Sequence, residues 1–94
     1  MLRFNDDLFT AMYPTLDLHG ETRFTMIHPL EVFINDNIRL QKEYIVIVHG
    51  RSGGVLKEEV HKYLKKDRRV VNFYVGFYNP GCTVVKLKLD NYKK

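Results

Sequence analysis

The alternation of apolar and polar residues along the chain predicts four strands. Residues 15–20 alternate between the two kinds of side chain, which indicates a short strand that ends at a glycine. Residues 44–48 are apolar at every position, as expected of a strand buried on both faces. Residues 70–78 and 83–89 alternate again and flank an Asn-Pro-Gly turn.

The stretches between these strands have the spacing of amphipathic helices. The first helix is expected to begin at a threonine cap, Thr22 or Thr25, and to end near Leu40, with Pro29 close to its first turn. The second is expected over residues 54–66. The predicted core-facing stripes are Ile27, Leu30, Phe33, Ile34 and Ile38 in the first helix and Leu56, Val60, Tyr63 and Leu64 in the second.

The predicted order of elements is β-α-β-α-β-β. Because crossovers between parallel strands are right-handed, both helices should cover one face of a four-stranded mixed sheet. The expected fold class is therefore α/β, as an α+β two-layer sandwich. Residues 15–89 are predicted to form one domain, with residues 1–14 as an N-terminal arm and residues 90–94 as a C-terminal tail.

The composition narrows the class of protein. A chain of 94 residues is long enough for one modest core. It has no apolar run near the roughly 20 residues that span a bilayer. Its N-terminus lacks the basic-then-apolar pattern of a signal peptide, and its single cysteine, Cys82, allows no intramolecular disulfide. These features predict a cytoplasmic protein that does not enter a membrane.

Positive charge is concentrated in the second half of the chain. Residues 1–50 contain four Lys or Arg and seven Asp or Glu, whereas residues 51–94 contain eleven and four. The resulting net charges of −3 and +7 favour a polyanionic partner such as nucleic acid. A solvated lysine-rich surface would produce the same balance, so charge alone does not identify the partner.

A glycine-rich turn separates the strand at 44–48 from the second helix. The first backbone N–H groups of a helix lack intrahelical partners and favour an anion, and glycines let that anion approach closely. The spacing matches neither the Walker loop nor the dinucleotide fingerprint, so a tight turn that binds nothing is the alternative interpretation. The residues predicted to bind phosphate here are Gly50, Arg51, Ser52, Gly53, Gly54 and Lys57.

A carboxylate and an imidazole lie together at the end of the first strand. Asp17 and His19 are two residues apart, so they point to the same side. Such a carboxylate can orient the ring and fix its tautomer, as a general base requires. Two polar groups on an exposed edge strand are the alternative. His28 and His61 are interpreted as surface residues, and one cysteine with scattered histidines cannot supply a closed zinc site.

Three separated segments together resemble the Smr (small MutS-related) domain. They are residues 16–20 (Leu-Asp-Leu-His-Gly), the His-Gly turn at 49–57, and residues 81–85 (Gly-Cys-Thr-Val-Val). The resemblance covers residues 15–89 and suggests a stand-alone small Smr protein. It implies a fold similar to the C-terminal domain of translation initiation factor 3. It also implies nucleic-acid binding, with nicking of DNA or cleavage of RNA in several members.

The resemblance also implies roles for individual residues. Asp17 and His19 fall on the motif implicated in cleavage. His49, Gly50 and Gly54 fall on the turn implicated in backbone binding and in the chemistry, and Gly81 and Thr83 add to the predicted nucleic-acid-binding set. The sequence departs from the family pattern at two places that bear on binding. Ser52 stands where a glycine is usual. Residues 79–82 (Asn-Pro-Gly-Cys) stand where two glycines and another small residue are usual.

The function predicted from these features is nucleic-acid binding with endonuclease activity, RNA being favoured over DNA. His19 would act as general base oriented by Asp17, and His49 would lie across the cleft. Attack by the 2′-hydroxyl of RNA needs a base and an acid but no metal, so no cofactor is expected. Asp17 could instead hold Mg²⁺, although one carboxylate makes a poor dedicated site.

Two other functions remain open at this point. One is a non-catalytic module that docks on RNA or on the ribosome through the same basic surface. The other is a protein-interaction or homodimerisation domain, which would use the second face of the sheet around Tyr74. If it does not bind a protein, this face, which also carries Lys86 and Lys88, is either solvated or a surface that stacks bases and contacts phosphates of nucleic acid. A monomer or a weak homodimer is expected.

Overall fold

A computed structural model describes residues 12–50, 54–76 and 80–89. Within these ranges the predicted β-α-β-α-β-β order is confirmed. Most of the predicted arm, the tail, and the turn residues Arg51, Ser52 and Gly53 lie outside the described residues. The elements are β1 (Thr15–Asp17), α2 (Ile27–Arg39), β2 (Tyr44–Val48), α3 (Val55–Lys66), β3 (Val70–Val75) and β4 (Cys82–Leu87).

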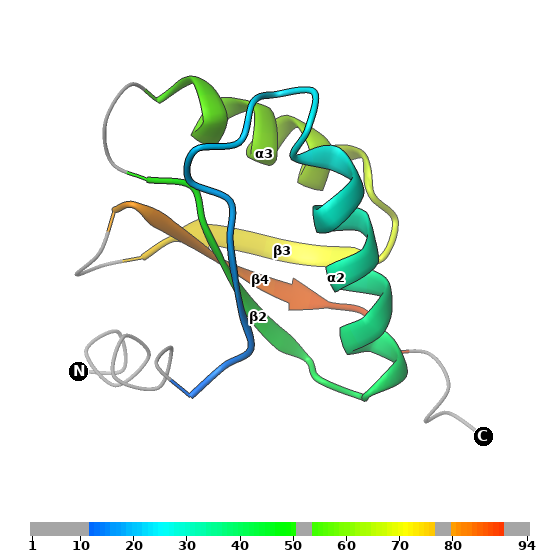
Figure 1. The fold of residues 1–94 in the computed structure, drawn as a ribbon. Coiled ribbons are helices and arrows are strands. Elements are labelled where there is room, and N and C mark those ends of the chain that lie inside the picture. Colours follow the sequence, from blue (N-terminus) through cyan, green and yellow to red (C-terminus); the bar gives the residue numbers. More distant parts are fainter. Residues whose placement is uncertain (1–11, 51–53, 77–79, 90–94) are drawn as a thin grey trace.

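The four strands form one mixed sheet in the order β1-β2-β4-β3. β1 runs parallel to β2, with Asp17 opposite Val48. β4 pairs with β2 and with β3 in the antiparallel sense, and Val48 lies opposite Cys82. Both helices lie over the same face of this sheet, which confirms the predicted two-layer arrangement (Figure 1).

The core lies between that face and the two helices. Leu30 and Ile34 of α2 and Val60 and Leu64 of α3 are buried, as their spacing predicts. From the sheet they meet the alternate residues Ile45, Ile47, Val85 and Leu87. One predicted member of the stripe is wrong, because Ile27 is exposed and Met26 is buried in the same cluster.

The start of α2 explains that difference. Thr22 Oγ1 accepts the backbone N–H of Thr25 at 3.1 Å, and Thr25 Oγ1 accepts the backbone N–H of Thr22 at 2.9 Å. The two predicted caps therefore close a turn before the helix instead of starting it. Pro29 has no N–H to donate to the residue four positions back, so regular helix is counted only from Ile27. Pro29 falls within the first turn, as expected.

β3 differs from the predicted alternation. Val70 pairs with Leu87 and Asn72 with Lys86, so Val71 is an additional residue in a β-bulge. The bulge displaces Val71 from the core face, and it is 55% exposed. The simple alternation expected over residues 70–78 is therefore wrong at Val71.

The second face of the sheet is not open at its centre. Tyr13 stacks on Tyr44 with ring centroids 5.4 Å apart, and both rings, together with Tyr74, pack against a second apolar cluster. The buried residues of that cluster are Val46, Cys82 and Val84. Tyr13, Tyr44 and Tyr74, all half-buried, therefore partly cover the centre of the face that was expected to be open. No helix in the described part of the chain is long and apolar enough to cross a membrane.

Candidate active site

The three motif segments converge at one end of the sheet. β1 and β2 are parallel and end at the same edge, and β4 begins there because it is antiparallel to β2. α3 also starts from this edge, because it follows β2 in the chain. In Figure 1 these segments meet at the upper left of the molecule. Topology thus gathers residues that are up to 66 positions apart, from Asp17 to Thr83.

Asp17 holds His19 in one orientation. Its Oδ1 atom accepts the His19 backbone N–H at 3.0 Å and lies 2.9 Å from His19 Nδ1. The side-chain hydrogen bond from His19 keeps the pKa of Asp17 below its usual value, so this oxygen stays an acceptor. The neutral ring therefore carries its proton on Nδ1 and leaves Nε2 as the base. The His19 side chain is 72% exposed, so a ligand can reach it.

The backbone of Gly50 is held at both its N–H and its C=O, close to Cβ of His19. Its N–H donates to the Gly81 carbonyl at 2.9 Å, and the His49 N–H donates to the same oxygen at 3.0 Å. Its carbonyl lies 3.1 Å from His49 Nδ1. Gly50 has φ of +97°, and a Cβ placed there would lie 3.7 Å from Cβ of His19. The 3.7 Å distance would be an ordinary contact, so it is the positive φ that favours glycine at this position.

His49 belongs to a buried hydrogen-bonded cluster. The residue is 4% exposed, and its Nε2 atom lies 2.8 Å from Thr83 Oγ1. The same oxygen lies 2.8 Å from His61 Nε2. The His61 ring meets that of His49 edge-on at 5.9 Å and that of Phe73 at 4.9 Å between centroids. We call His49, Thr83 and His61 the histidine–threonine cluster.

The interpretation of His61 as an ordinary surface residue is therefore wrong, because the residue is only partly exposed and its ring bonds to a buried hydroxyl. His61 lies one position from Val60 and three from Leu64 on α3, at the edge of the buried stripe. That spacing was the available signal in the sequence. Its hydrogen-bond partner Thr83 is 22 residues away, and no local pattern connects them. His28, by contrast, is exposed as predicted.

Both histidines of the cluster are electrostatically disfavoured as cations. Burial lowers the pKa of His49, and the ammonium of Lys57 lowers it further, although the hydrogen bond to Gly50 acts in the opposite direction. Burial also lowers the pKa of His61, with further lowering by His49, Lys57 and Lys65. Both rings are thus neutral near pH 7, and Lys57 lies close enough to act on each.

The remaining predicted binding residues divide into two groups. Gly54 precedes α3 with φ of +89° and provides no side-chain cap, and Lys57 lies half-buried in the first turn. Both are therefore available at a helix N-terminus that favours anions. Thr83, however, is 0% exposed and its hydroxyl is committed to two imidazoles. A direct contact of Thr83 with nucleic acid is excluded in this conformation.

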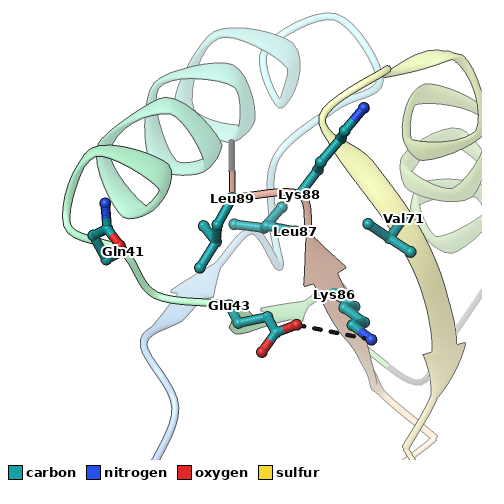
Figure 2. Close-up of a pocket in the computed structure, with 7 residues that line it drawn as sticks. All are labelled: Gln41, Glu43, Val71, Lys86, Leu87, Lys88 and Leu89. Carbon is teal, nitrogen blue, oxygen red and sulfur yellow. Dashed lines mark ion pairs between the residues drawn. The ribbon is translucent and has the colours of Figure 1, made fainter. Parts of the chain in front are cut away.

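A hollow of about 420 Å³ lies at the other end of β4, away from these residues (Figure 2). In Figure 2 the side chain of Lys86 turns toward Glu43, and Nζ lies 3.7 Å from Oε2. Among the described residues, no histidine lines this hollow, and its one carboxylate, that of Glu43, forms an ion pair with Lys86. Its lining is Gln41, Glu43, Val71, Lys86, Leu87, Lys88 and Leu89. The candidate site is therefore the edge of the sheet at which the three motif segments converge.

Comparison with known proteins places this arrangement in a family. The family model described as the Smr domain matches residues 16–88. A Geobacillus protein named endonuclease MutS2 is 40% identical over 76 residues, which are 78% of this chain and 10% of that protein. The endonuclease MutS2 of Caldanaerobacter subterraneus is 31% identical over 88 residues, which are 90% of this chain and 11% of that protein. The chain thus spans about a tenth of these relatives.

Solved structures agree with the fold. The crystal structure of the Smr domain of Thermus thermophilus MutS2 superposes with a TM-score of 0.75 at 25% identity, covering 80% of this chain and 98% of that chain. YdaL, a stand-alone small MutS-related protein from Escherichia coli, superposes with a TM-score of 0.76 at 17% identity, covering 81% and 67%. With the family match over most of its length, this chain belongs to the Smr domain family.

Proposed function

We propose that this domain binds nucleic acid and cleaves a phosphodiester bond, with RNA favoured over DNA. The observation that carries the proposal is the exposed His19 ring, which Asp17 holds as the Nδ1–H tautomer beside the Gly50 turn. Membership of the Smr family supports a nucleic-acid partner, and relatives bear the name endonuclease. The basic second half of the chain supports the same partner.

In the proposed reaction, His19 Nε2 takes the proton of the RNA 2′-hydroxyl. The 2′-oxygen then attacks phosphorus, the bond from phosphorus to the 5′-oxygen breaks, and water supplies the proton that the leaving oxygen needs. Negative charge that develops on the phosphate would face Lys57 and the N-terminus of α3. Both ring nitrogens of His49 are engaged within the protein, so we assign it a positioning role beside His19.

The residues around Asp17 do not fit a dedicated Mg²⁺ site. Asp17 Oδ1 already accepts two N–H groups from His19. Among the residues that the structure describes, no group of three His, Cys, Asp or Glu side chains could hold a metal ion. Mg²⁺ prefers several oxygen ligands. The proposed reaction therefore uses no metal ion and should continue in the presence of EDTA.

The test is single-turnover cleavage of end-labelled single-stranded RNA and duplex DNA, with and without EDTA. His19→Ala and Asp17→Asn should lose about 10²–10⁴-fold in rate, as expected when a general base is removed or misoriented, while binding is retained. His28→Ala, which removes an exposed histidine from α2, serves as the matched control and should cleave like wild type. Cleavage that survives His19→Ala would refute the proposed base.

A non-catalytic docking module is the second candidate, because the same basic residues would serve it. It predicts salt-dependent binding of RNA or ribosomes without cleavage by the wild type. Salt-sensitive binding with no cleavage of either substrate would therefore replace the enzyme proposal. The cytoplasmic location and the monomeric or weakly dimeric state stay predictions.

A further inference from the structure

The histidine–threonine cluster allows a unique assignment of its protons. A carbonyl only accepts, so the 3.1 Å contact with the Gly50 oxygen requires a proton on His49 Nδ1. A neutral His49 then has no proton on Nε2, and this nitrogen must accept the hydroxyl proton of Thr83 at 2.8 Å. That hydroxyl has one proton to give. His61 Nε2, also at 2.8 Å, must therefore donate to Thr83 Oγ1.

The reverse assignment fails on geometry. If Thr83 donated to His61, His49 Nε2 would need the proton, and a neutral His49 would then present a lone pair from Nδ1 to the lone pairs of the Gly50 oxygen. The three bonds consequently run in one direction, from His61 through Thr83 and His49 to the Gly50 carbonyl. No buried side-chain nitrogen or oxygen in the described residues is left without a partner.

We propose that His61 is a positioning residue of the active site, which acts through Thr83 and His49 to hold the Gly50 carbonyl beside His19. The Gly50 N–H is fixed independently by the Gly81 carbonyl, so the cluster supplies the second restraint, on the Gly50 C=O. A Cβ at Gly50 would lie 3.7 Å from Cβ of His19, so the Gly50 backbone passes directly beside the residue that carries the general base. The catalytic part of the inference rests on the proposed function.

The direction of the bonds argues against a proton relay to substrate. The series ends at a backbone carbonyl, which cannot pass a proton on. His61 is also held by packing, because its ring meets Phe73 and the edge of His49. Its role is therefore to fix a tautomer and an orientation, as outer-shell partners of functional histidines do elsewhere.

The first test is nitrogen-15 NMR of the imidazoles of the wild-type protein at neutral pH. It should find the proton of His49 on Nδ1 and that of His61 on Nε2. In His61→Phe, which keeps a ring against Phe73 but removes the donor, the His49 Nδ1–H should exchange with solvent about threefold to tenfold faster. Finding the His49 proton on Nε2, or an unchanged exchange rate in the variant, would overturn the proposal. Neither readout requires cleavage, so this result stands even if the domain proves not to be a nuclease.

The second test measures kcat and KM for RNA cleavage. His61→Phe should lower kcat/KM by about threefold to tenfold, the effect of one net hydrogen bond. His61→Gln should restore most of the loss, because its amide N–H can replace Nε2–H. His28→Gln is the matched control on an exposed histidine. Equal loss in His61→Phe and His61→Gln would show that only packing matters and would refute positioning through the hydrogen bond.

Discussion

Replacing Thr83 with valine would test the histidine–threonine cluster through stability alone. Valine preserves the size, the β-branch and the strand preference of threonine, and replaces only the hydroxyl with a methyl group. Thr83 is 0% exposed, so water cannot take the place of that hydroxyl. The substitution leaves the buried Nε2 of His49 without its donor at 2.8 Å, and leaves His61 Nε2–H without its acceptor.

The expected loss follows from those two groups. A buried polar atom left without a partner costs about 1–3 kcal/mol. The contribution from His61 should be smaller, because that residue is partly exposed and water can solvate it. The added methyl returns up to about 0.8 kcal/mol through burial. The net expectation is a loss of about 2 kcal/mol, or roughly 8–16 °C in melting temperature for a domain of this size.

Urea denaturation followed by circular dichroism measures this difference. Thr83→Ser retains the hydroxyl and should lose less than Thr83→Val, although it removes a buried methyl. Thr15→Val is the matched control, because Thr15 is an exposed strand residue whose hydroxyl donates only to the Tyr13 carbonyl. It should stay within about 0.5 kcal/mol of wild type. A Thr83→Val protein as stable as wild type would refute the hydrogen-bonding role of this hydroxyl.

Three further results are expected. Burial lowers the pKa of His49 and His61 below the ordinary 6.5, so the unfolded chain binds more protons than the folded chain below that pH. The free energy of unfolding should therefore fall as the pH drops from about 7.5 to 5, and it should fall less steeply in His61→Phe. A flat pH profile would contradict this expectation. Gly50→Ala should lower the free energy of unfolding by about 1–2 kcal/mol, because φ is +97°, and should also reduce cleavage. Gly20→Ala, at a φ of +90°, should lower stability as well but should affect cleavage less. Equal losses of cleavage in the two variants would argue against a special role for the Gly50 turn. Lys57→Gln should lower the salt dependence of nucleic-acid affinity by about one phosphate contact in a filter-binding titration, unlike a lysine substitution on the solvent side of α3, and an unchanged slope would remove Lys57 from the interface.

Local patterns in the sequence determined the elements and one of the functional pairs. The apolar run at Tyr44–Val48 and the stripe of α3 need no distant partner to be recognised, because burial selects apolar residues at a fixed period. Asp17 and His19 are only two residues apart, so their proximity could be read from the sequence, although β1 ends at Asp17 and their two hydrogen bonds form in the turn that follows the strand. The convergence of the three motif segments, by contrast, depends on how β1, β2 and β4 pair in the sheet.

Only the tertiary structure decided which other side chains support the site. His49, His61 and Thr83 come from three elements, and the two contacts with Thr83 bridge 34 and 22 residues. Polar residues that satisfy one another inside a protein leave no periodic trace, since periodicity reports burial of apolar surface and not hydrogen-bond partners. For the same reason the sequence did not reveal the bulge that exposes Val71, which is a matter of register between two strands.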